Sequence, residues 1–87
     1  MSDKVVIAIF DTKAKFYKSP TMMRTRGEAL RAFSDLANDK QTEIGKHPED
    51  FVLFMLATFD EVKGVYHNLP CPESLGVASE FIAPEKE

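Results

Sequence analysis

The sequence predicts a small α+β domain: one helix packs on one face of an antiparallel or mixed β-sheet, in the order β-(β)-α-β-β. Residues 4–10 and 51–59 are rich in β-branched and aromatic side chains and are apolar on both alternating faces, as in central strands. Residues 25–37 instead repeat apolar side chains at the helical period. Since two cores do not fit into 87 residues, residues 1–87 are expected to form a single domain.

The N-terminal segment is expected to supply the first strands of the sheet. The first strand covers residues 4–10, and residues 11–12 form a turn after it. Residues 14–17 predict a second, more polar strand. This strand ends at residues 19–20, Ser-Pro, because proline has no N–H group to offer a neighbouring strand.

The helix is expected to run from residue 26 to residue 38. Thr25 lies three residues before Glu28, which is the spacing of a reciprocal cap. In such a cap the Thr25 hydroxyl accepts from the Glu28 N–H, and the Glu28 carboxylate accepts from the Thr25 N–H. The flexible side chains of Met22 and Met23 are expected to fold back on the first turn. The apolar side chains that share one stripe of the helix are Ala29, Leu30, Phe33, Leu36 and Ala37.

The segment after the helix is expected to be a connecting loop, followed by a hairpin. Residues 39–50 are polar and contain a glycine and a proline, which favours a loop. Residues 51–59 follow as the most apolar strand. Residues 60–64 then fit a hairpin connection, because Gly64 suits a position of positive φ.

The C-terminal part is expected to close the sheet. Residues 65–69 return as a shorter strand, which Pro70 and Pro72 are expected to end. Residues 73–82 fit either a short helix or an edge strand. Residues 83–87 are expected to form a frayed tail.

Counting the faces of the sheet predicts a further partner. One helix covers only one face, whereas both central strands are apolar on two faces. The second face therefore needs another cover, either the C-terminal tail or a second copy of the chain. Of the two, a homodimer is the expected arrangement.

The composition excludes several classes of protein. A single cysteine excludes a disulfide scaffold, and the absence of any apolar run of about 20 residues excludes a membrane-spanning helix. The apolar run at residues 5–10 is too short for a signal peptide. We therefore expect no membrane association and a cytoplasmic location.

The charge of the chain is unevenly distributed. The net charge of −3 argues against a generally basic nucleic-acid-binding protein. The segment from Thr12 to Arg26, however, holds five basic residues and no acidic one, so the rest of the chain carries −8. The candidate nucleic-acid-binding residues are the basic side chains of this segment and one tyrosine: Lys13, Lys15, Tyr17, Lys18, Arg24 and Arg26.

These residue types suit single-stranded nucleic acid. In the predicted second strand, Lys13, Lys15 and Tyr17 project to one side and offer two phosphate partners beside one ring on which a base can stack. Arg24 and Arg26 lie at the start of the helix, whose N–H groups and dipole favour anions. The alternative is that the lysines only protect a solvent-exposed edge strand from aggregation.

No motif indicates catalysis or metal binding. The chain has no glycine-rich phosphate loop, hydrolase elbow or paired-cysteine motif, so neither enzyme activity nor a cofactor is expected. His67 and Cys71 are four residues apart, but a zinc site needs two further ligands, and no metal is expected. Residues 47–50, His-Pro-Glu-Asp, are expected to form a turn that ends the loop rather than an acid–base pair.

Several short motifs resemble a known family. They are Phe10-Asp11-Thr12-Lys13-Ala14, Pro20, Arg24-Thr25, Glu28-Ala29, Arg31, Phe33-Ser34-Asp35, Asn38, His47-Pro48-Glu49-Asp50-Phe51-Val52-Leu53, Thr58-Phe59-Asp60 and Gly64. Over roughly residues 4–69 the sequence resembles the small non-structural protein of gokushoviruses, which are single-stranded-DNA phages of the microvirus group. The resemblance implies a non-capsid accessory protein in the cytoplasm of a bacterial host, with a role in DNA binding or in single-stranded genome synthesis.

Two functions follow from the sequence. The first is a non-enzymatic phage accessory protein that binds single-stranded DNA during viral genome replication or packaging. The alternative is a protein-interaction module that contacts a viral or host replication protein without binding nucleic acid. In that case the contact surface is the acidic loop 39–50 or the tail, and the basic segment is only an edge guard.

Overall fold

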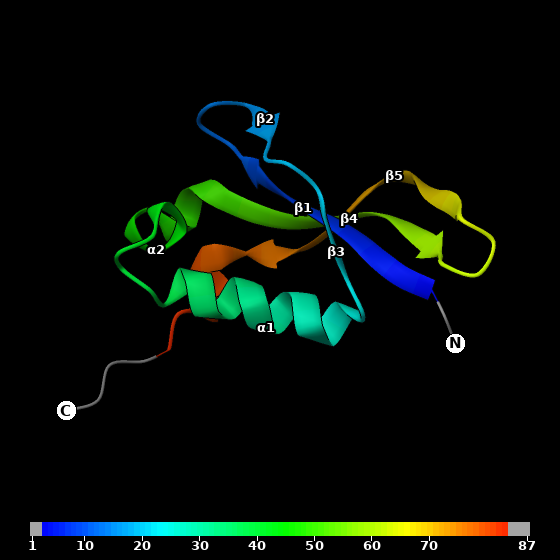
Figure 1. The fold of residues 1–87 in the computed structure, drawn as a ribbon. Coiled ribbons are helices and arrows are strands. Elements are labelled where there is room, and N and C mark those ends of the chain that lie inside the picture. Colours follow the sequence, from blue (N-terminus) through cyan, green and yellow to red (C-terminus); the bar gives the residue numbers. More distant parts are fainter. Residues whose placement is uncertain (1–2, 84–87) are drawn as a thin grey trace.

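The structure, a computed structural model, describes residues 3–83 and confirms the predicted α+β class (Figure 1). The elements are β1 (Asp3–Asp11), β2 (Phe16–Tyr17), β3 (Thr21–Met23), α1 (Arg26–Ala37), α2 (Glu43–Lys46), the 3₁₀ helix η1 (Pro48–Asp50), β4 (Phe51–Asp60), β5 (Val65–Val77) and the 3₁₀ helix η2 (Ala78–Phe81). The predicted central strands and the predicted main helix are all present. From residue 84 onward, the predicted frayed tail lies outside the described residues.

The strands form one antiparallel sheet with α1 along one of its faces (Figure 1). The strand order is β2-β1-β4-β5, and β3 pairs with β1 on the same edge as β2. Every strand pair is antiparallel, which decides between the antiparallel and mixed sheets that the sequence allowed. The central strands are β1 and β4, as their apolar composition predicts.

Helix α1 begins almost as its capping residues predict. The Thr25 hydroxyl accepts a hydrogen bond from the Glu28 N–H at 3.0 Å. The Glu28 carboxylate reaches back one residue further than predicted and accepts from the Arg24 N–H at 2.7 Å. Asn38 ends the helix, because its N–H bonds to the carbonyl groups of the last turn.

The hydrophobic core lies between α1 and the sheet. Phe33, Phe51 and Leu53 are its largest fully buried side chains. The C-terminal segment 73–82 packs on this same side, because Ala78 is buried in the core and the Phe81 ring lies 5.6 Å from the Phe33 ring. As far as residue 83, the tail therefore does not cover the second face of the sheet.

Two predictions for the segment before α1 are only partly correct. The predicted strand 14–17 is reduced to Phe16 and Tyr17, because the chain forms a turn over residues 12–15. Met22 and Met23, expected to fold back on the first turn of the helix, belong to β3, where they pair with Val6 and Val5 of β1. Met23 nevertheless packs against the core and lines a pocket together with Ala29 of the first turn, as expected.

The predicted connecting loop 39–50 contains two short helices, α2 and η1. The Thr42 hydroxyl caps α2 by accepting from the Gly45 N–H at 3.0 Å. Gly45 is required for space, because a Cβ atom here would lie 1.9 Å from the Asp39 carbonyl oxygen. The loop prediction missed these helices because each is only one turn long.

The prediction that Pro70 and Pro72 end the last strand is also wrong, since β5 continues to Val77. Asn68 pairs with Ala57 and Glu73 pairs with Met55, so residues 69–72 all lie opposite a single residue of β4. Both prolines fall in this bulge on an edge strand, where a missing N–H group breaks no ladder hydrogen bond. The tail is thus an edge strand followed by a 3₁₀ helix.

Candidate nucleic-acid interface

The sheet has a second face, opposite α1, which we call the open face. The strand register and the alternation of side chains assign to it Lys4, Val6, Ala8 and Phe10 of β1, Tyr17 of β2, Met22 of β3, Val52, Phe54, Ala57 and Phe59 of β4, and Tyr66, Asn68, Ser74 and Val77 of β5. The buried residues of α1, α2 and η2 all belong to the core on the other face. Within residues 3–83 the open face is therefore left without a helix.

Aromatic rings gather at both ends of the open face. At one end, the ring centroids of Phe10 and Tyr17 lie 4.7 Å apart, and those of Tyr17 and Phe54 lie 5.6 Å apart. At the other end, the centroids of Phe59 and Tyr66 lie 4.8 Å apart. Tyr17 is 42% exposed and Tyr66 is 55% exposed, so both tyrosine rings are accessible to a ligand.

The turn over residues 12–15, the first turn, is held by Asp11. The Asp11 side chain is buried and accepts hydrogen bonds from the N–H groups of Lys13 and Ala14 at 3.0 and 3.1 Å. The Lys15 N–H donates to the Asp11 carbonyl oxygen at 2.7 Å, and Lys15 has a φ of 66°. Asp11 thereby fixes a turn that exposes two lysine side chains.

The first turn is also tied to the loop before β4. Both the N–H and the hydroxyl of Thr12 donate to the carbonyl oxygen of Asp50 at 2.9 Å. Asp11-Thr12 and His47-Pro48-Glu49-Asp50 are two of the motifs on which the family resemblance rests. The structure brings them into contact and gives both a structural role.

The structure divides the six candidate residues into two groups. Lys13, Lys15 and Tyr17 lie together at one end of the open face, although they share a turn and a strand end rather than one continuous strand. Lys13 and Lys15 are exposed, and neither forms an ion pair within residues 3–83. Their ammonium groups are available for phosphates.

The other three cations each have a carboxylate partner. Their ion pairs join Lys18 to Glu43 at 3.0 Å, Arg24 to Glu28 at 3.4 Å and Arg26 to Glu73 at 2.6 Å. The hydrogen bond from the Arg24 N–H, together with its guanidinium, lowers the pKa of Glu28. The start of α1 therefore already holds a carboxylate, which weakens the case for an anion site there.

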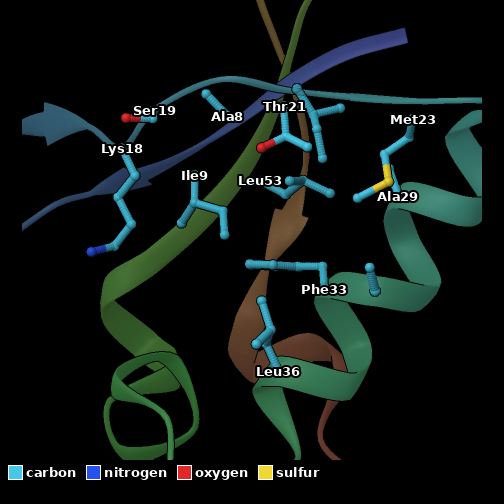
Figure 2. A pocket seen from close by; sticks show the side chains of 12 residues that line it. Ala8, Ile9, Lys18, Ser19, Thr21, Met23, Ala29, Phe33, Leu36 and Leu53 are labelled. Atoms are coloured by element: carbon cyan, nitrogen blue, oxygen red, sulfur yellow. The ribbon is translucent and has the colours of Figure 1, made fainter. Parts of the chain in front are cut away.

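An apolar pocket of about 130 Å³ lies on the helix side of the sheet, between β1, β3 and α1 (Figure 2). Figure 2 shows Lys18 and Ser19 at one end of it and Met23 and Ala29 at the other. The Lys18 ammonium lies 5.6 Å from the centre of the Phe51 ring as well as beside Glu43. Sequence reasoning missed this pocket, because β3 was not predicted.

The predicted turn at residues 47–50 is confirmed as η1. Pro48 occupies its first position, and the Asp50 N–H donates to the His47 carbonyl oxygen at 3.0 Å. Potential metal-ligand atoms of His47, Glu49 and Asp50 lie within 4.8 Å of one another. Because His47 and Glu49 are exposed, water solvates these groups without an ion, and the absence of a metal stays a prediction.

The aromatic partners of Tyr17 were not predicted as site residues. Phe10, Phe54, Phe59 and Tyr66 all occupy open-face positions of strands whose two apolar faces were recognised. A signal was present in the sequence, because a Phe-Asp pair with a Tyr seven residues after the Phe occurs twice, from Phe10 to Tyr17 and from Phe59 to Tyr66. The period of two within each strand places these rings on one face.

Comparison with known proteins identifies the family. The sequence model of a family described as Phage ORF5 protein matches residues 4–81. No curated protein and no solved structure matches the chain. No helix of residues 3–83 is long and apolar enough to cross a membrane. Because the family match covers most of its length, the chain belongs to the Phage ORF5 protein family.

Proposed function

We propose that this phage protein is a non-enzymatic accessory protein that binds single-stranded DNA during viral genome replication or packaging. It acts in the cytoplasm of the bacterial host, as expected for the gokushovirus proteins that the sequence resembles. The observation that carries the proposal is the position of Lys13 and Lys15 on the turn beside the exposed Tyr17 ring. Cations along the DNA backbone and rings under the bases are the two elements that single-strand binding requires.

The arrangement favours a single strand over a duplex. The exposed Tyr17 ring lies on a sheet face, tilted by 54° against the Phe10 ring and by 72° against the Phe54 ring, and it offers an aromatic surface on which a base can stack. In a duplex the base faces are already stacked, and a protein reads the base edges through the grooves instead. An unpaired base is free to stack on the ring.

Charge supports the same location. The chain contains 14 acidic residues, yet none of the open-face strand positions within residues 3–83 holds one. Within residues 3–83 the carboxylates lie instead on the helix side, in the turns and in the loops. The net charge of −3 therefore does not repel DNA from the open face itself.

Titration of labelled single-stranded and duplex DNA at several salt concentrations tests the proposal. The test variant is Lys13→Glu/Lys15→Glu, and the matched control is Lys40→Glu/Lys46→Glu, which changes two other exposed lysines and the net charge equally. We expect the log–log salt slope on single strands to weaken by about 1.4 in the test variant, because each lost phosphate contact contributes about 0.7. The control should keep the native slope.

Two results would overturn the proposal. One is no binding of the native protein to single-stranded DNA at about 50 mM salt, where backbone contacts are strong. The other is an equal loss of affinity in the test and control variants, since that would reduce the effect to net charge. The protein-interaction module would then become the better function, with the two lysines as an edge guard.

The homodimer stays a prediction. The dimer was predicted because the second, open face of the sheet needs another segment or chain packed on it. Within residues 3–83 the C-terminal tail does not pack there. Val6, Ala8 and Ala57 of that face are nevertheless already buried in the single chain. Sedimentation velocity of the free protein at micromolar concentration tests the dimer, because a monomer would contradict the face-counting argument.

A further inference from the structure

We propose that the bound single strand crosses the whole open face, from Tyr17 at the first turn to a second stacking site at Tyr66. This inference deepens the proposed function and rests on it. Residues 61–64 form the second turn. Phe10 with Tyr17 is the first ring pair, and Phe59 with Tyr66 is the second ring pair.

The two turns share one hydrogen-bond pattern. The Asp60 side chain accepts from the N–H groups of Val62 and Lys63 at 3.0 and 3.1 Å. The Gly64 N–H donates to the Asp60 carbonyl oxygen at 2.7 Å, and Gly64 has a φ of 70°. Asp11 makes the corresponding bonds in the first turn at 3.0, 3.1 and 2.7 Å. The hairpin turns after Asp11 and after Asp60 therefore have the same hydrogen-bonded structure.

The two ring pairs also match in geometry. Phe10 and Tyr17 are partners across β1 and β2, with an angle of 54° between their ring planes. Phe59 and Tyr66 are partners across β4 and β5, with an angle of 51°. A ring pair that can hold a base at one end of the face is therefore reproduced at the other end.

The open-face strand positions between the ring pairs, within residues 3–83, hold no negative charge that would repel an anionic polymer. Phe59 pairs with Lys4, and Phe10 lies six residues further along β1, so the two pairs are roughly 20 Å apart at the rise of a strand. Along this path Val6, Ala8 and Ala57 form a buried floor. No carboxylate occupies an open-face strand position between the pairs, within the part of the chain that the structure describes.

Charge complementarity favours DNA over a second copy of the chain on this face, so this inference competes with the homodimer predicted from the uncovered face. A second copy would bring its own Lys13 and Lys15 and, from its open-face strand positions, no carboxylate to pair with them. A DNA backbone supplies a negative charge at every nucleotide. The pairing of lysines with apolar rings is the composition of a single-strand groove.

The tyrosines themselves provide the test, because the chain contains two tyrosines and no tryptophan. The variant Tyr17→Phe leaves Tyr66 as the only strong fluorophore, and Tyr66→Phe leaves Tyr17, while both variants keep a ring at each site. The probes are oligo(dT) strands of about 4 and about 16 nucleotides, which bracket the usual site sizes of single-strand-binding folds. We expect the long strand to quench both tyrosines and the short strand to quench only Tyr17.

Affinity measurements complete the test. Tyr66→Ala should weaken binding of the long strand by about 5- to 150-fold, as for the loss of one stacked base, and should leave the short strand unaffected. Val65→Ala is the matched control, since Val65 is exposed on the same strand but is adjacent to Tyr66 and so points to the other face. Thermal melting checks that both variants fold.

The possible failures are distinguishable. If the long strand quenches Tyr17 but not Tyr66, the second stacking site is wrong and the proposed function stands. If neither tyrosine responds and no binding occurs, the proposed function fails as well. If Tyr66 emission changes with protein concentration and not with DNA, the open face pairs with a second copy, and the inference is overturned.

Discussion

The first and second turns have the same backbone and different charges. Each turn follows a Phe-Asp pair, is held by the aspartate side chain and ends in a residue of positive φ before a cross-strand tyrosine. The first turn carries Lys13 and Lys15, where the second turn carries Val62 and Gly64. Because the second turn forms without lysines at these positions, folding does not require them in the first turn.

Lys15 makes this contrast sharper. Glycine is the residue that adopts positive φ without steric strain, and Gly64 does so in the second turn. Lys15 takes the same conformation with a Cβ atom, which a non-glycine residue does rarely. Gly64 shows that the matching position of the second turn is filled without a lysine. The strain at Lys15 therefore indicates a role of this lysine in function rather than in folding.

The largest expected effect is on the aspartates that hold the turns. Asp11→Ala should lower the free energy of unfolding by about 2 kcal/mol, because it leaves two N–H groups beside a buried position without their acceptor. Asp60→Ala should lower it by about 1 kcal/mol, because its bonds are exposed to water. Urea unfolding measures both. Equal losses would show that burial does not distinguish the two turns.

The next effect comes from giving the second turn the charges of the first. Val62→Lys/Gly64→Lys adds two cations at the far end of the proposed DNA path. No atom crowds a Cβ at Gly64, and the lysine there would take the same strained positive φ as Lys15. If both reach phosphates, affinity for a long single strand should fall about sevenfold more than in the native protein between about 50 and 200 mM salt. An unchanged salt slope would place the DNA away from the second turn. A short strand serves as the control, since it should not detect the change.

A smaller effect concerns the anchoring of the first turn. Thr12→Val should lower the free energy of unfolding by about 1 kcal/mol, because it removes the hydrogen bond from the hydroxyl to Asp50. Glu61 occupies the matching position of the second turn, where its side chain makes an exposed ion pair with Lys4 at 3.8 Å and no other polar contact within residues 3–83. Glu61→Val should therefore change stability by less than about 0.5 kcal/mol. Chemical denaturation of both variants compares them, and a larger loss in Glu61→Val would contradict the anchoring role.

The smallest effect has opposite signs for stability and binding. Lys15→Gly should raise the free energy of unfolding by about 0.5 kcal/mol, since relief of the positive-φ strain outweighs the greater freedom of glycine in the unfolded chain. The same variant should weaken the salt slope on single-stranded DNA by about 0.7, through the loss of one phosphate contact. A variant that became less stable, or that bound DNA as before, would remove the functional explanation for this lysine.

Local patterns in the sequence predicted those elements of the fold that depend on interactions between residues close in the sequence. The β-branched run before Asp11 and the capping pair Thr25 and Glu28 each specify one element through neighbouring residues. The strand 14–17 was wrong because alternation of polar and apolar residues does not reveal the bonds that Asp11 makes to the following N–H groups. The prediction that Pro70 ends the last strand was wrong for a similar reason, since a bulge depends on the pairing with the partner strand.

The candidate site was predictable only in part. Lys13, Lys15 and Tyr17 are close in the sequence, so their proximity could be inferred. The partners of Arg26 and Lys18 could not be, because Glu73 and Glu43 lie 47 and 25 residues away. Pairing between distant residues is decided by the register of the sheet and by the packing of the helices, neither of which a single sequence displays.

The bulge in β5 also bears on how copies of the protein would pack if they bind DNA as proposed. Neighbouring copies would lie at high local concentration, where an exposed, regular edge strand invites strand-to-strand pairing and aggregation. The four residues 69–72 interrupt this edge, and two of them are prolines that cannot donate to an incoming strand. On DNA bound as proposed, such an edge would hinder neighbouring copies from pairing strand to strand.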